Sequence, residues 1–168
     1  ASAGYNGGGN NAYGNNGNNG NSGYNGNQNI PPPPQQQAPA FTNGFVKLRN
    51  TSTNNYINLE KGTLGCSVIN NEWWSAQWQL IPVTENGINY YTIQNRWKGS
   101  FLSLDRNGLI LDNGQSNTAL WVLETLDGGN TYTIKNGTRN AALADANGMM
   151  QAGPLFHGQT NAKWVIEQ

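Results

Sequence analysis

The sequence is poor in cysteine, histidine and charge, and each shortage excludes a class of protein. Of 168 residues, one is cysteine (Cys66) and one is histidine (His157). A single cysteine excludes a disulfide within the chain, although a secreted protein can lack disulfides, so the count leaves the compartment open. Basic and acidic residues number nine each, so no positive excess is present to hold a phosphate backbone. We therefore expect no nucleic-acid partner.

Long apolar runs are also missing. No segment approaches the roughly 18 consecutive apolar residues of a membrane-spanning helix, so we expect no membrane insertion. The first residues, Ala-Ser-Ala, are the kind of remnant that either signal-peptide cleavage or a cloning step leaves. Asn50 and Asn136 each begin an Asn-x-Ser/Thr acceptor pattern for glycosylation, but that pattern arises often by chance in an Asn-rich chain.

Residues 1–40 carry no charge and differ in composition from the rest of the chain. Gly and Asn dominate, punctuated by Tyr5, Tyr13 and Tyr24, and a Pro/Gln-rich stretch follows. Such a segment has too little apolar surface to offset its ordering entropy, which predicts a disordered low-complexity tail and linker. Its Asn/Gln bias with spaced aromatics is prion-like. Two interpretations follow: a solubilising linker, or a segment that promotes self-association through its tyrosines.

Residues 41–168 have the pattern of an all-β domain. Three segments with period-two alternation, FVKLRN, YYTIQN and YTIKN, each end in asparagine, and seven residues later an apolar residue follows. The paired positions are Asn50 with Ile57, Asn95 with Leu102, and Asn136 with Leu143. Short strands at regular spacing, separated by polar turns and without an amphipathic helix, predict a closed β architecture.

Three tryptophans recur at a fixed period. Trp78, Trp121 and Trp164 are 43 residues apart, each with Ala two places before it and Leu or Ile two places after it. Such a period is typical of repeat architectures. The units span about 45–83, 90–126 and 132–168, with about four short strands each. Because one unit cannot bury its own apolar face, we expect three to pack around an axis, with these tryptophans in the core.

The segments DRNGLI and DANGMM align in the second and third units. The alignment matches Asp105 with Asp145 and Asn107 with Asn147, while Glu60 begins a shorter segment at the same place in the first unit. Asn-Gly between apolar pairs predicts a tight turn, since both residues tolerate positive φ.

Three units of about 40 residues that each end in a tryptophan motif resemble a ricin-type β-trefoil lectin domain. The resemblance covers about 125 residues and excludes the tail. That family ends each unit in Gln-x-Trp and carries paired cysteines, whereas this chain has Ala-x-Trp and one cysteine. The Y-x-I-x-N openings and the ending KWVIEQ are similar to divergent fungal members. The resemblance implies a β-trefoil that binds glycans or glycoproteins without catalysis or cofactors, in a secreted, extracellular or cell-wall protein.

The same resemblance implies candidate binding residues. In the family, the sugar is held by an Asp after the second strand, an aromatic on the next hairpin and an Asn-Gln pair before the repeat tryptophan. No unit here has the complete pattern, and Trp73, Trp74 and Trp97 are aromatics that do not recur, either sugar platforms or local packing. The candidates are Asn58, Asn70, Asn71, Trp73, Trp74, Trp97, Asp105, Asn107, Asp112, Asn113, Asn117, Asp145, Asn147 and His157. For each Asp the alternative is an Asx turn.

Support for catalysis or a metal site is thin. No residues frame Cys66 and His157 as a nucleophile and base, and no His/Cys cluster has metal-ligand spacing. Asp105 with Asp112 is the one carboxylate pair that we consider for glycoside hydrolysis. We therefore expect a non-enzymatic protein. Two other functions stay open: a trefoil protease inhibitor acting through NNEWWSA or AGPLFHGQ, and a structural or adhesive self-assembling protein.

Overall fold

The computed structural model describes residues 44–168, which form antiparallel β-strands joined by short turns. The predicted tail of residues 1–40 lies outside the described residues. In the described part, the helical segments are two 3-10 turns, η1 (Trp74–Ala76) and η2 (Asn117–Ala119). None of the helical segments there is long and apolar enough to span a membrane. The all-β prediction is confirmed.

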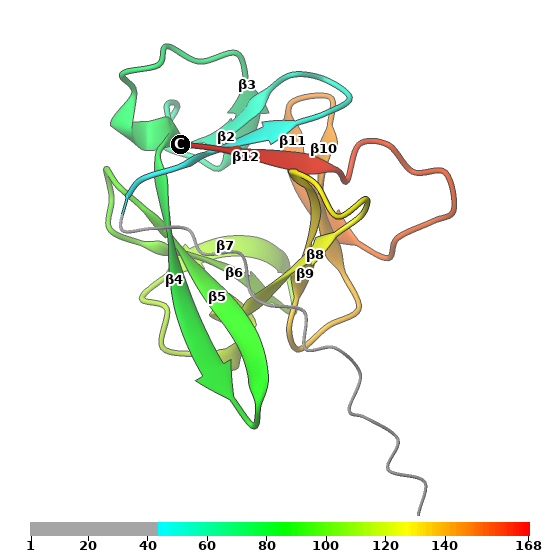
Figure 1. The fold of residues 1–168 in the computed structure, drawn as a ribbon. Coiled ribbons are helices and arrows are strands. Elements are labelled where there is room, and N and C mark those ends of the chain that lie inside the picture. The colour runs from blue at the N-terminus through cyan, green and yellow to red at the C-terminus, as the bar shows by residue number, and fades with distance from the viewer. Residues whose placement is uncertain (1–43) are drawn as a thin grey trace, which may run out of the picture. The chain divides into compact units, whose positions relative to one another are not determined.

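The strands follow one another in three sets of four (Figure 1). The first unit contains β1 (Lys47–Asn50), β2 (Tyr56–Asn58), β3 (Gly65–Ser67) and β4 (Trp78–Glu85). The second contains β5 (Ile88–Asn95), β6 (Phe101–Asp105), β7 (Gly108–Asp112) and β8 (Trp121–Thr125). The third contains β9 (Thr131–Asn136), β10 (Ala142–Ala146), β11 (Met149–Gly153) and β12 (Trp164–Glu167).

The first and last strands of the three units pair with one another and close into a barrel. The last strand of each unit pairs antiparallel with the first strand of the next, in the pairs β4–β5, β8–β9 and β12–β1. Within the second and third units, β5 pairs with β8 and β9 with β12. A single bridge between Val46 and Trp78 completes the ring in the first unit. Closure leaves no unpaired sheet edge around the barrel.

The second and third strands of each unit are not part of the barrel, and they pair with each other as the hairpins β2–β3, β6–β7 and β10–β11. Strand β11 contacts β3 and β7, and the backbone N–H of Cys66 donates to the carbonyl of Gly148 at 3.0 Å. The Asn147-Gly148 turn has φ of 56° and 91°, which confirms the predicted tight turn there. A barrel of six strands with three hairpins is the trefoil arrangement that the repeat predicted.

The three repeat tryptophans lie in the core. Each has zero exposed surface, and each indole N–H donates to a backbone carbonyl in the second strand of its own unit. The bonds run from Trp78 to Ile57 at 2.9 Å, from Trp121 to Leu102 at 2.8 Å and from Trp164 to Leu143 at 2.9 Å. These bonds tie the ring to the hairpins and give each fully buried indole N–H the partner that a buried donor needs.

The three repeat asparagines join each unit to its neighbour. The side-chain amides of Asn50, Asn95 and Asn136 donate to the carbonyls of Asn161, Ser75 and Thr118, at 2.7–2.9 Å. Each acceptor lies three residues before a repeat tryptophan of the preceding unit. Asn50 and Asn136 are 0% and 4% exposed, so the folded domain has no room for a glycan on either acceptor pattern. The asparagines therefore hold the three units together.

Candidate functional site

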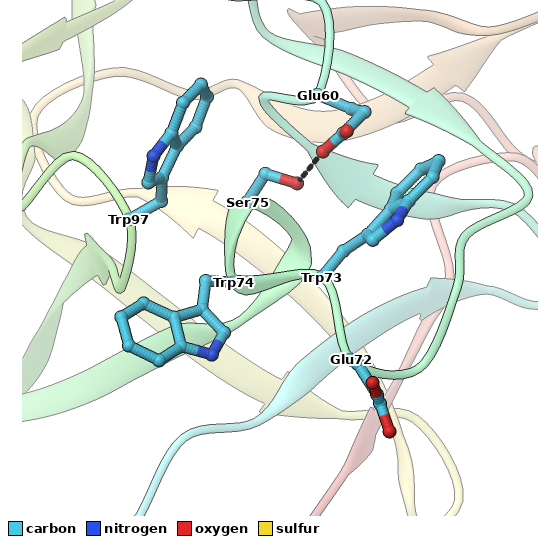
Figure 2. Close-up of a pocket in the computed structure, with 6 residues that line it drawn as sticks. All are labelled: Glu60, Glu72, Trp73, Trp74, Ser75 and Trp97. Carbon is cyan, nitrogen blue, oxygen red and sulfur yellow. Dashed lines mark hydrogen bonds between the residues drawn. The ribbon is translucent and has the colours of Figure 1, made fainter.

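Three tryptophans that do not recur in the repeat line one hollow on the domain surface. This tryptophan notch, about 480 Å³ in volume, is lined by Glu60, Glu72, Trp73, Trp74, Ser75 and Trp97 (Figure 2). Trp97 comes from the β5–β6 loop of the second unit, and the other residues come from the first unit. The notch therefore lies at a junction between units.

A part-buried hydrogen bond joins two of the residues that line the notch. The hydroxyl of Ser75, a residue only 3% exposed, donates to Oε2 of Glu60 at 2.5 Å. In Figure 2 this pair lies between the indole rings of Trp73 and Trp97. Since Ser75 occupies only Oε2, the other carboxylate oxygen of Glu60 stays open to a donor from outside.

Asn95 positions the two segments that form the notch, the turn at Ser75 and the loop at Trp97. Its side-chain N–H donates to the Ser75 carbonyl at 2.9 Å, and its Oδ1 accepts the backbone N–H of Trp97 at 3.0 Å and of Lys98 at 3.1 Å. One buried side chain thus positions the turn that carries Ser75 and the loop that carries Trp97. The interaction that joins the units therefore also sets the width of the notch.

The three tryptophan rings have different surroundings. Trp74 covers the guanidinium of Arg96, 4.3 Å from its ring centroid, and the same guanidinium lies 4.6 Å from the ring of Phe45. In Figure 2, Trp74 lies on the opposite side of the 3-10 turn from the Glu60–Ser75 pair. Trp97 is 47% exposed, with the Lys98 ammonium 3.9 Å from its ring centroid. Trp73 and Trp97 are therefore the rings that flank the carboxylate.

The other two junctions of the trefoil lack these aromatics. Two residues after the junction asparagine stands Trp97 in the second unit, Thr138 in the third and Ser52 in the first. The junction of the third and first units is occupied by protein contacts instead, because Thr53 donates its hydroxyl to Asp145 at 2.6 Å. The tryptophan notch thus occurs at one of the three equivalent junctions within residues 44–168.

The candidates of the second unit do not converge on one place. Asp105 and Asn107 lie at the tip of the β6–β7 hairpin, and Asp112 and Asn113 lie at its base. Asp105 accepts the N–H of Asn107, and Asp112 accepts the N–H of Gly114, both at 2.7 Å. These are the Asx turns that formed the alternative for each Asp. Asn117 is exposed at the start of η2.

Asp105 and Asp112 are also too far apart for hydrolysis of a glycosidic bond. Asp112 pairs across the hairpin with Phe101, four residues before Asp105 on β6. At about 3.4 Å per residue along the strand, this separation is about 14 Å. Glycosidases hold their two carboxyl groups about 5–9.5 Å apart. In the described residues no group of three His, Cys, Asp or Glu side chains could hold a metal ion.

Asp145 is buried, contrary to its expected place in a binding site. It lies two residues after Leu143, whereas Asp105 lies three residues after the equivalent Leu102, so the alignment of DRNG with DANG was wrong by one residue. A shift of one residue turns a strand side chain to the opposite face. Asp145 is 2% exposed. Burial raises its pKa, but hydrogen bonds from Thr53, Gly148, Asn55 and Cys66 outweigh this, so its pKa is lowered overall.

Asn58 is buried as well, and three further candidates of the first and third units are exposed outside the notch. Asn58 donates to the Tyr56 carbonyl and the Ser67 hydroxyl, and its Oδ1 accepts the N–H of Glu60, so its polar atoms are used inside the protein. Asn70 accepts the N–H of Glu72, and Asn71 accepts the Lys47 ammonium. His157 is exposed in the β11–β12 loop.

Glu60 and Ser75 are site residues that the sequence interpretation missed. Glu60 stands three residues after Ile57, as Asp105 stands three after Leu102, so the two carboxylates occupy equivalent positions in their units. Asp105 was a sequence candidate, whereas Glu60 was passed over because it is Glu and not Asp. Ser75 gave no signal of its own, because its role depends on contact with Glu60, 15 residues away.

A crevice adjoins the notch and shares two of its residues. This adjoining crevice, about 560 Å³ in volume, lies between the β2–β3 and β10–β11 hairpins. Glu60 and Trp73 line both hollows, and Lys61, Thr63, Asn147 and Met149 are among the residues that line the crevice alone. Of the sequence candidates, Trp73, Trp74 and Trp97 line the notch and Asn58, Trp73 and Asn147 line the crevice.

Neither protein-family models nor curated proteins give a match to the sequence, whereas solved structures do. The chain is similar to SeviL bound to an asialo-GM1 saccharide, with a TM-score of 0.63 and 22% identity over 76% of this chain and 98% of that chain. It is similar to BEL, described as a β-trefoil, with a TM-score of 0.60 and 18% identity over 75% of this chain and 94% of that chain.

A third similar structure is the Polyporus squamosus lectin bound to a human-type influenza-binding epitope. The TM-score is 0.60 and the identity is 15%, over 75% of this chain and 49% of that chain. These likenesses agree with the barrel and hairpins described above, and the chain has the β-trefoil fold.

Proposed function

We propose that this β-trefoil is a non-enzymatic carbohydrate-binding domain and that the tryptophan notch is its binding site. The observation that carries the proposal is the Glu60–Ser75 pair between the rings of Trp73 and Trp97. The C–H face of a pyranose packs on an indole ring, and a fixed carboxylate oxygen accepts from sugar hydroxyls. An apolar wall with a few convergent polar groups is the usual composition of a small-molecule site.

The solved structures of similar fold support the same class of function. SeviL is bound to asialo-GM1 saccharide, and the Polyporus squamosus lectin is bound to a sialylated epitope, so this fold serves sugar binding in those proteins. The asymmetry of the present chain adds an independent reason. A ring needed only to support the fold would recur at each junction, as Trp78, Trp121 and Trp164 do, whereas Trp97 does not recur.

The test is a glycan array probed with the full chain and its variants. We expect a dissociation constant of about 0.1–1 mM per site for a simple sugar, a binding free energy of about −4 to −5.5 kcal/mol. Trp97→Ala and Glu60→Gln should each weaken binding at least tenfold. The matched control is Phe156→Ala, which removes a 71% exposed aromatic far from the notch in sequence and should leave binding unchanged. Absence of binding to every glycan by the folded wild-type protein would refute the proposal.

We further propose that the tail arrays these domains through self-association, in a secreted or cell-wall protein. Weak single sites gain from multivalency, and an uncharged segment with spaced tyrosines supplies a means of association. Replacement of Tyr5, Tyr13 and Tyr24 with Ser in the full chain should abolish assembly in sedimentation experiments without changing the affinity for a monovalent sugar. Assembly that persists would show that tyrosines are not responsible.

Protease inhibition is a second candidate, favoured by one observation. Phe156 is 71% exposed and Leu155 is 37% exposed in the β11–β12 loop, within the segment AGPLFHGQ. Apolar side chains presented on a loop suit insertion into a protease cleft. Assays against serine, cysteine and aspartic proteinases test this directly, and Phe156→Ala should relieve any inhibition found.

A further inference from the structure

The tryptophan notch and the adjoining crevice are two parts of one longer surface. Glu60 and Trp73 line both hollows, so one elongated ligand bound over these two residues can occupy both hollows at once. Volumes of about 480 and 560 Å³ each fall within the roughly 300–1,000 Å³ of small-molecule sites. A single sugar ring placed in the notch would leave the crevice empty.

Side chains of the crevice offer polar groups that the protein does not use. Lys61 and Thr63 are exposed and make no side-chain hydrogen bond within residues 44–168, and the same holds for Asn147. Met149 beside them is 64% exposed. The crevice thus repeats the composition of the notch, with an apolar surface next to unoccupied donors and acceptors.

Charge on the two hollows is small. The charged residues that line them are Glu60, Glu72 and Lys61, two carboxylates and one ammonium, for a net charge of −1. A sialylated or sulfated chain would therefore gain no net attraction from this surface. A neutral chain is not repelled here, since its hydroxyls can donate to carboxylate and amide oxygens and accept from ammonium, amide and hydroxyl groups.

We propose that the ligand is a neutral, linear oligosaccharide of at least two sugar rings, with one ring in the notch and the next in the crevice, across Trp73. This inference rests on the proposed function and defines its substrate class. Glu60 lies at the centre, where its free carboxylate oxygen meets hydroxyls of both rings. Trp97 then serves the notch ring alone, and Lys61 and Thr63 serve the crevice ring alone.

The experiment compares chain lengths on the full protein. The probes are mono- to hexasaccharides of the chito-, cello-, malto- and β-1,4-galacto-series, together with sialyllactose as an acidic probe, measured by calorimetry. In the series that binds, affinity should rise at least tenfold from the monosaccharide to the di- or trisaccharide, and sialyllactose should bind more weakly. Lys61→Ala with Thr63→Ala should remove this gain and leave monosaccharide affinity unchanged, while Trp97→Ala should weaken every length by the same factor.

The matched control is Arg106→Ala with Asn107→Ala, at the equivalent turn of the second unit, which should leave all affinities unchanged. Equal affinity for one ring and for several would overturn the extended site while the notch stands as a monosaccharide site. An undiminished gain in the Lys61/Thr63 variant, or preference for the acidic probe, would overturn it too. Failure of every probe here, with binding on the array, would also refute the assignment to neutral linear chains, whereas failure on the array as well would refute the proposed function itself.

Discussion

Replacing Asn95 with Ala should damage both the fold and the binding site, whereas the same change at Asn136 should damage the fold alone. Asn95 donates to the Ser75 carbonyl and accepts from Trp97 and Lys98. Asn136 makes the equivalent contacts one unit later, donating to the Thr118 carbonyl. Only the first of these junctions carries the tryptophan notch.

The magnitude follows from what each lost bond leaves behind. The Ser75 carbonyl still accepts the N–H of Leu59 at 3.1 Å, so removal of the Asn95 amide leaves it with a partner. The N–H groups of Trp97 and Lys98 both lose Asn95 Oδ1 as their acceptor, and both bonds are part-buried although the two residues are exposed. Water can therefore satisfy these donors only in part. With about 1–3 kcal/mol for an unsatisfied buried donor and about 1 kcal/mol for the other bonds, the variant should lose about 2–4 kcal/mol of unfolding free energy.

Urea unfolding and sugar titration by tryptophan fluorescence measure the two effects separately. Titrations are done at a temperature where both variants are folded. Asn95→Ala should then bind at least fivefold more weakly than wild type, because the Trp97 loop has lost its anchor, and Asn136→Ala should bind as wild type does. Equal losses of affinity in the two variants, or unchanged affinity in Asn95→Ala, would refute the role of Asn95 in positioning the notch.

Three further outcomes are expected. Trp121→Ala should cost about 3–5 kcal/mol of unfolding free energy in urea titrations, because it leaves a cavity at the centre of the barrel. Asp145 has a lowered pKa in the folded protein, so its contribution to stability is complete above its ordinary value of 3.8 and is lost as the pH falls through the folded value; Asp145→Asn should flatten the acid part of a stability-against-pH curve. Burial and the neighbouring Asp145 raise the pKa of Cys66, so iodoacetamide at pH 8 should label it in urea and leave the native thiol unmodified over the same time.

The repeat could be read from the sequence because the same residues recur three times at a fixed period. The tryptophans, the junction asparagines and the apolar positions seven residues later each have three copies, and periodicity alone predicts their burial. The face on which Asp145 lies could not be read this way. Asp105 lies three residues after Leu102, whereas Asp145 lies two residues after Leu143, so the two Asp side chains lie on opposite faces of their strands. The close match between DRNG and DANG hid this difference of one residue.

The site was harder to predict than the fold because it occurs once and is assembled from distant segments. Glu60 and Trp97 are 37 positions apart in the sequence with Ser75 between them, and only packing at the junction of two units brings the three together. The unrepeated tryptophans were visible as exceptions in the pattern, and all three line the notch. The position of Glu60 beside Trp73 and Trp97 could not be predicted, since the sequence does not show which residues a polar side chain in a turn contacts.

The junction asparagines and the residues two places after them have different roles, so this scaffold can change the number of its binding sites without changing the contacts that hold it together. Asn50, Asn95 and Asn136 hold the three junctions together, while the residue two places later is free to be Ser, Trp or Thr. Duplicated units can therefore diverge in specificity one at a time without endangering the barrel. Thr138→Trp would place an indole at the second of these junctions, at the position equivalent to Trp97.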